Sequence, residues 1–266
     1  MSRLKLSVPP YAEPINLIEA KLHCRTDEED EDARIQGLIR GARRWAEQRT
    51  ERQLVAATWH LLLDYFPEEI RLPYPPLIGV DSITYVDTNG ATQTLASTEY
   101  QVVGAGTDAP ARVVESYDGD GWPTTRDQPE AVTVAFKAGY VTPFTAVAAT
   151  DFLTWKGRTP SNGTLVRLSN SGGSLPGGLS TDTDYYVVSQ SSNTCKLSLT
   201  SGGSAVDITD AGSGTSFIGV LPATLADAML LLISTRYRLR GGEDSVTDWQ
   251  EAADNLVGYE WTGAYA

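Results

Sequence analysis

The first fifty residues carry hydrophobic side chains at helical spacing. Asn16 followed three positions later by Glu19 is typical of a capping box and predicts a short helix over residues 17–23. A second helix is expected over residues 27–49 with Asp27 as its N-cap, because the five residues after Asp27 are acidic and favour the positive end of the helix dipole. The apolar stripe of this helix consists of Ile35, Leu38, Ile39, Ala42, Trp45 and Ala46.

Beyond residue 57 the pattern changes to short runs rich in β-branched and aromatic residues. Turn signals such as Asn89-Gly90 separate these runs, which is typical of antiparallel strands joined by tight turns. The expected strands are residues 58–66, 69–72, 82–86, 93–95, 100–103, 112–116 and 131–137.

Between residues 142 and 219 the composition shifts towards Ser, Thr and Gly, while short strand-like runs persist. The Gly-rich stretches fall between apolar runs, so we interpret them as turns of an inserted all-β domain. Helical periodicity then returns, with Pro222 in a first turn and Gly241-Gly242 as the stop signal. The apolar stripe of this helix is expected to pack on the stripe of the second helix.

These patterns predict an α+β fold: a helical bundle with a small antiparallel β portion, plus an inserted all-β domain. The expected domains are a main domain of residues 1–141 and 220–242, the inserted domain of residues 142–219, and a C-terminal segment of residues 243–266. This last segment is polar and acidic but holds large apolar residues. Two interpretations stay open: it becomes ordered on a partner, or it docks on its own subunit.

The net charge of −13 argues against a protein that grips DNA phosphates over a broad surface, and it also favours solubility. Arginines on the second helix either bind an acidic neighbour or nucleic acid, or pair with nearby acids of the same subunit. Cys24 and Cys195 lie far apart without a CxxC pattern, so no disulfide framework or zinc site follows. No signal peptide or membrane span is expected, which favours synthesis and assembly in a cytoplasm.

Motifs for catalysis are not found. His23 and His60 are the two histidines, and neither stands in a nucleophile elbow or a metal-binding pattern. Residues 118–121, Asp-Gly-Asp-Gly, resemble the start of a calcium loop but are better explained as a tight acidic turn. We therefore predict no catalytic, cofactor or metal site, although a hydrolase that uses two unrecognised carboxylates stays open as an alternative.

An ordered series of segments resembles phage head–tail connector (adaptor) proteins. The series covers residues 15–141 and 221–240, and no single segment in it is specific. Its pieces are Leu17–His23, the acidic start and apolar stripe of the second helix, Thr58–Phe66, Leu72–Val80, Asp120–Pro123, Val132–Tyr140, Leu221–Met229 and Arg236–Arg238.

The resemblance implies a virion structural protein that is not an enzyme and has no cofactor. It implies a homo-oligomeric ring, typically of twelve copies, between the portal protein and a tail-side neck protein, with DNA passing through the lumen without specific binding and with no membrane contact. It makes the C-terminal segment a candidate portal contact through Trp249, Leu256, Tyr259 and Trp261.

An alternative function involves the inserted domain. It is similar to small β modules of other phage structural proteins, and exposed aromatic residues in it would stack on sugars. The candidates for carbohydrate or host-surface binding are Trp155, Tyr185 and Tyr186.

Overall fold

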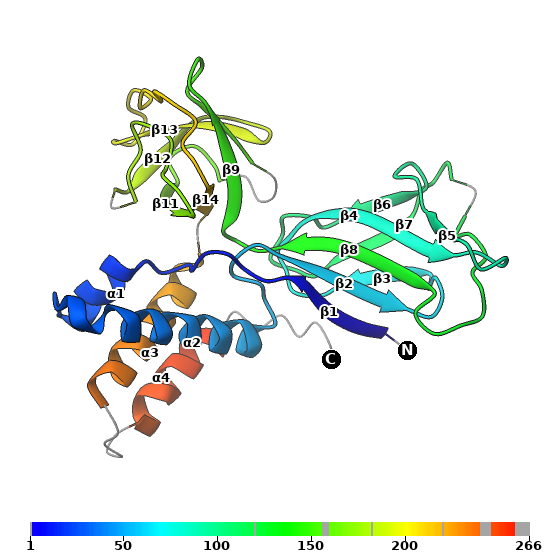
Figure 1. The fold of residues 1–266 in the computed structure, drawn as a ribbon, viewed down its shortest axis with the longest axis horizontal. Coiled ribbons are helices and arrows are strands. Elements are labelled where there is room, and N and C mark those ends of the chain that lie inside the picture. Colours follow the sequence, from blue (N-terminus) through cyan, green and yellow to red (C-terminus); the bar gives the residue numbers. More distant parts are fainter. Residues whose placement is uncertain are drawn as a thin grey trace.

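The chain folds into three bodies, which are a helical module, a β-sandwich and a β-barrel (Figure 1). The structure, a computed structural model, describes residues 2–119, 121–155, 160–181, 183–219, 221–239 and 246–258, and for residues 246–250 it describes the backbone alone. The barrel and the helical module lie at one end of the molecule, and the sandwich extends away from both.

The helical module brings together segments from both ends of the sequence. It consists of α1 (Leu17–Cys24), a 3-10 turn (Glu29–Glu31), α2 (Asp32–Thr50), α3 (Ala223–Leu239) and α4 (Val246–Gly258). The predicted packing of the second helix on the helix after residue 222 is confirmed, because Ile35 and Ile39 of α2 share one buried core with Met229 and Ile233 of α3. Val257 of α4 is fully buried against the same core.

The two predicted helix starts have different outcomes. At α1 the Asn16 side chain accepts a hydrogen bond from the Glu19 backbone N–H at 2.7 Å, which confirms the N-cap. The prediction that Asp27 caps the second helix is wrong, because α2 begins at Asp32 after the 3-10 turn and has no side-chain cap bond. Asp32 is held by Lys21 of α1 at 2.7 Å, so the helix starts where its packing against α1 starts.

The β-sandwich consists of two antiparallel sheets. One has the strand order β1-β2-β8-β4-β5 and the other β3-β7-β6, and both bury side chains such as Ile70, Val113 and Phe136 in a shared core. The bounds are β1 Ser2–Val8, β2 Ala57–Leu63, β3 Glu69–Leu72, β4 Leu77–Val86, β5 Thr92–Thr94, β6 Tyr100–Val103, β7 Ala111–Glu115 and β8 Val132–Ala138.

The barrel is a closed antiparallel sheet with the strand order β10-β13-β12-β11-β14-β9. Its first and last strands pair side by side, with Thr142 opposite Ile218. The bounds are β9 Thr142–Val147, β10 Phe152–Trp155, β11 Leu165–Ser171, β12 Tyr185–Ser191, β13 Thr194–Ser198 and β14 Thr215–Gly219.

The predicted fold class, a helical bundle with a small antiparallel β portion, is wrong. The described residues are mostly β, with fourteen strands in three sheets and four α-helices. Strand β1 was missed although Leu4, Leu6 and Val8 alternate with polar residues, because this short run stands alone before the first helix and its partner strand β2 lies far along the chain. The inserted all-β part of the prediction fits the barrel.

Candidate functional site

The three bodies meet where two extended segments cross. Leu54–Ala56, which leads from α2 into β2, is bonded to Gly139–Val141, which leads from β8 into β9: the Tyr140 and Val141 N–H groups donate to the Leu54 carbonyl at 3.1 and 3.0 Å, and the Ala56 N–H donates to the Val141 carbonyl at 2.8 Å. Gly139 has φ +148°, and a Cβ atom on it would lie 2.5 Å from the Ala56 nitrogen. Glycine is therefore required at this crossing.

A buried polar network braces the crossing. The Arg52 guanidinium donates to the Tyr140 hydroxyl, which donates to an Asp108 carboxylate oxygen at 2.8 Å, and Arg52 lies 3.4 Å from Asp108. Burial raises the pKa of the Tyr140 hydroxyl, so it stays protonated and keeps donating at physiological pH. The network joins the end of α2 to loops of the sandwich.

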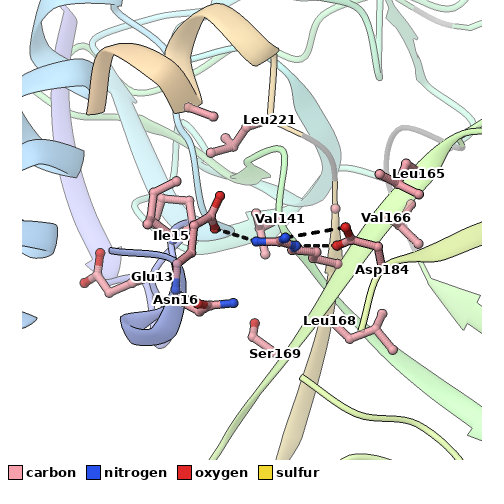
Figure 2. Close-up of a pocket in the computed structure, with 15 residues that line it drawn as sticks. Glu13, Ile15, Asn16, Val141, Leu165, Val166, Leu168, Ser169, Asp184 and Leu221 are labelled. Carbon is pink, nitrogen blue, oxygen red and sulfur yellow. Dashed lines mark hydrogen bonds and ion pairs between the residues drawn. The ribbon is translucent and has the colours of Figure 1, made fainter. Parts of the chain in front are cut away.

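A cleft of about 240 Å³ separates α1 from the barrel (Figure 2). Ile15 and Asn16 line one side and strand β11 lines the other, with Arg167 of β11 reaching across. Arg167 donates hydrogen bonds to Asp184 within the barrel, one of them at 3.4 Å, and forms an ion pair with Glu19 of α1 at 3.0 Å. The dashed lines in Figure 2 mark this bridge between the two bodies.

The charges in the cleft bind the two bodies to each other. The hydrogen bond to Asp184 raises the pKa of Arg167, with Glu19 adding to the effect, so the cation is neutralised by two carboxylates. The charge is then satisfied inside the subunit and leaves little attraction for an anionic ligand. Among the residues that the structure describes, no group of three His, Cys, Asp or Glu side chains is placed to hold a metal ion.

Arginines of α2 form ion pairs within the subunit, as the local interpretation expected. Arg43 donates to Glu13 at 2.8 Å and to Glu47 at 2.9 Å, and it is itself buried. Arg49 donates to Asp254 of α4 at 3.1 Å. These bonds tie α2 to the segment before α1 and to the C-terminal helix.

The four residues predicted to meet the portal are only partly described. Trp249 belongs to α4, but its side chain lies outside the description, and Tyr259 and Trp261 lie outside the described residues altogether. Leu256 is half-buried and packs against the core of the helical module. The described part of the C-terminal segment therefore docks on its own subunit.

Two aromatic residues suggested for sugar stacking are not available to a ligand, so that prediction is wrong for them. Tyr185 is 2% exposed and Trp155 is 3% exposed, and both fill the core of the barrel. Tyr186, the neighbour on the opposite face of β12, is only partly exposed. The alternation of β12 explains the error, because one of two adjacent aromatic residues must point inward.

The two cysteines are free and buried. Burial raises the pKa of the Cys195 thiol to about 12, so the thiol is unreactive in the folded barrel. Between residues 116 and 119 a tight turn forms, with the Gly119 N–H donating to the Ser116 carbonyl at 3.1 Å. Asp120, the second acid of the calcium-like motif, lies outside the described residues.

The sequence did not single out the residues that join the bodies. Arg167 and Asp184 each look like an ordinary surface charge in their local pattern, and Glu19 was noted only as part of a capping box, because its ion pair with Arg167 joins segments far apart in the sequence. The Gly139-Tyr140 pair at the end of a strand was the one local signal available, because glycine there marks a close approach of two backbones.

Comparison with known proteins gives one family and one fold. Residues 14–106, from the start of the helical module to the end of β6, match the family model of phage gp6-like head–tail connector proteins. No curated protein matches the chain. None of the helices described is long and apolar enough to cross a membrane.

Three solved structures share the fold over nearly the whole chain. A chain of the virion of a native gene transfer agent particle is 18% identical with a TM-score of 0.56, and the match covers 97% of this chain and 95% of that chain. A chain of the neck of the native particle, computed with C12 symmetry, is 17% identical with a TM-score of 0.52, over 98% and 95%. A chain of the neck of the empty particle, computed with C6 symmetry, is 18% identical with a TM-score of 0.51, over 98% and 95%.

Proposed function

We propose that the chain is an adaptor subunit between portal and tail, on the premise that its residues 14–106 match the phage gp6-like head–tail connector family, in agreement with the sequence resemblance. The family match and the fold shared with virion neck chains together support a structural protein of a virion neck. The single observation that carries the proposal is the family match over residues 14–106, where α1, α2 and most of the sandwich lie.

We propose that copies of the chain close into a ring of about twelve subunits through which DNA passes. The C12 symmetry with which one similar neck was computed supports this number. A closed ring requires two different surfaces on each subunit, one for each neighbour. The net charge of −13 fits a lumen that repels DNA and lets it slide without specific binding.

We further propose that each part of the chain has its own role. Residues 1–141 and 220–242 form the connector body, residues 142–219 form an inserted barrel, and residues 243–266 dock on the portal through Trp249, Tyr259 and Trp261, while Leu256 holds α4 in place. A tail-side neck protein meets the opposite face of the ring. The role is structural, without catalysis or a cofactor.

The experiment that tests the adaptor role is electron microscopy of the purified chain with its cognate portal ring, beside the chain alone. A ring seated on the portal is the expected result. A chain that stays monomeric and leaves the portal bare at concentrations far above those of the portal would refute the proposal.

The docking segment has its own test. A Tyr259→Ala/Trp261→Ala variant is expected to bind the portal at least about tenfold more weakly, because aromatic anchors dominate interface energies. Tyr117→Ala is the matched control, since this tyrosine is 93% exposed on a sandwich loop and belongs to neither proposed surface. Equal portal binding by all three proteins would exclude the two aromatic residues as anchors.

A further inference from the structure

We propose that ring neighbours meet through α1 and α2: the exposed apolar face of α1 and the acidic turn after it dock on the outer face of α2 of a second copy. The inference builds on the proposed adaptor function, because it names the contact by which the ring closes. It is carried by three features of the helical module, which are an unpaired basic helix face, an exposed apolar helix face and the charge complementarity between them.

The outer face of α2 carries two arginines that form no ion pair with any residue that the structure describes. Of the five arginines of α2, Arg43 and Arg49 form ion pairs within the subunit, and Arg34 lies 5.9 Å from the centre of the Tyr237 ring. Arg40 and Arg44 are exposed, and within the described part of the chain neither has an ion pair. Arg43, Arg49 and Arg34 thus contact other parts of the helical module, whereas Arg40 and Arg44 have no ion pair among the described residues and face outward, where another chain could meet them.

The same face of α2 also carries small residues, which leave the helix backbone accessible. Gly37 lies between Ala33 and Arg40 on it, and glycine in a helix interior costs about 1 kcal/mol relative to alanine. A Cβ atom on Gly37 would meet only the Arg40 guanidinium, at 4.0 Å, so nothing inside the subunit requires a glycine there. A second chain that approaches the helix backbone closely would require it.

The surface proposed to bind this basic face lies at the α1 end of the helical module. Ile18 and Leu22, one helical turn apart on α1, are 56% and 78% exposed, which is unusual for large aliphatic side chains on a short helix. The exposed Arg25 stands just after α1, and four exposed acidic residues follow it in the next turn: Asp27, Glu28, Glu29 and Asp30. Figure 1 shows α1 beside the beginning of α2, so the apolar pair and the acids share one end of the module.

The two surfaces carry opposite charges, so each attracts the other surface and repels a second copy of itself. Arg44 lies roughly 18 Å along α2 from its first residue, Asp32, by the helical rise, so the basic face and the acidic end are distinct patches. Contact between the acidic end of one copy and the basic face of the next offsets local repulsion in a chain with a net charge of −13. A head-to-side contact of this kind repeats around a ring, as heterologous closure requires.

Charge reversal tests the pairing. The acidic-end variant Glu28→Lys/Asp30→Lys and the basic-face variant Arg40→Glu/Arg44→Glu are each expected to raise the concentration needed for ring formation at least about tenfold, measured by mass photometry with and without portal rings. The variant with all four changes restores complementarity and is expected to assemble within about threefold of wild type. Failure of the four-change variant to recover, while its thermal unfolding is unchanged, would overturn the proposal.

Two further variants separate assembly from folding and from net charge. Lys5→Glu/Arg126→Glu makes the same charge change as the basic-face variant, but on exposed residues of the sandwich, and is expected to leave ring formation unchanged. Gly37→Gln is expected to melt no lower than wild type, because glutamine favours helix, and yet to assemble at least about tenfold less well because its bulk blocks close approach. Normal assembly by Gly37→Gln and by the basic-face variant would overturn the proposal. If the basic-face variant assembled normally but the particles lost DNA, Arg40 and Arg44 would lie at the lumen and not at the contact between subunits.

Cross-linking decides between a ring and a twofold dimer. The variant Asp27→Cys/Arg44→Cys places one thiol on each surface, whereas the native Cys24 and Cys195 are buried. Oxidation is expected to give a ladder of covalent oligomers beyond the dimer, because each copy joins two different neighbours. A product that stops at the dimer would overturn the ring contact. A wild-type chain that neither self-associates nor seats on the portal would refute the adaptor function itself, whereas wild-type rings without a ladder refute only this contact.

Discussion

Replacing Gly139 by alanine is predicted to destabilise the whole molecule, since this residue lies where the three bodies meet. Its φ of +148° is one that residues with a Cβ rarely adopt. The added methyl carbon would lie 2.5 Å from the Ala56 nitrogen, 2.7 Å from the Ala56 Cα and 2.7 Å from the Val55 carbonyl carbon. All three are backbone atoms bound into the crossing of Leu54–Ala56 with Gly139–Val141, so no side-chain rotation relieves the overlap.

The expected cost of Gly139→Ala combines two effects. A strained backbone conformation costs about 1–3 kcal/mol, and overpacking by one carbon atom costs about 1–3 kcal/mol more. We therefore expect about 3 kcal/mol, and since 1 kcal/mol shifts the Tm of a chain of this size by about 2–4 °C, the transition should fall by about 6–12 °C. Thermal unfolding followed by circular dichroism measures this shift.

Gly79→Ala is the matched control in the neighbouring strand β4. No atom lies within 4 Å of the Cβ position of Gly79, so alanine there is expected to change the stability by less than about 1 kcal/mol in either direction. A Gly139→Ala protein that unfolds within about 2 °C of wild type would refute the reasoning, because the crossing would then have room for a side chain.

Three more predictions follow from single contacts. Hydrogen bonds from Arg71 and Arg112 lower the pKa of the Glu69 carboxyl group. Wild type is therefore expected to be more stable than Glu69→Gln above the ordinary carboxyl pKa, and to lose this advantage as the pH falls through the lowered pKa of the folded state. Melting curves of both proteins across the acid range measure this difference. Arg43→Met leaves two carboxylates unpaired around a buried position and is expected to cost about 3 kcal/mol in urea unfolding, whereas an unchanged midpoint would exclude a structural role for the network. The Cys195 thiol, with a pKa of about 12, is expected to react with a thiol reagent only at the rate at which the barrel opens, and immediate labelling of the native protein would contradict its burial.

Local patterns predicted the helices better than the strands. The N-cap at Asn16 depends on residues three positions apart, so the sequence contains all the information that this cap needs. The start of α2 depends instead on the bond between Lys21 and Asp32, eleven positions apart, and the acidic run suggested an earlier start. Strand β1 does alternate, with Leu4, Leu6 and Val8 between polar residues, but it is an edge strand whose partner β2 lies far along the chain, so the local pattern alone did not place it in a sheet.

The candidate surfaces were harder to predict because they depend on which side chains the fold leaves unused. The sequence shows five arginines on α2 without distinguishing those that bond to Glu13, Glu47 and Asp254 from those that face solvent. Likewise Tyr185 and Tyr186 are adjacent and chemically equal, and only the placement of β12 in the closed barrel decides which one is buried. Family resemblance supplied the function, since the composition of the chain excludes classes of activity but selects none.

The pairing of β9 with β14 has a consequence for how the barrel is joined to the rest of the chain. Thr142 and Ile218 lie opposite each other in adjacent strands, so the chain enters and leaves the barrel at points only about 5 Å apart. An insertion with such ends replaces a short turn and adds little loop-closure entropy to its host. We therefore expect this position to accept another folded domain whose two ends lie side by side, with the remainder of the chain still folding.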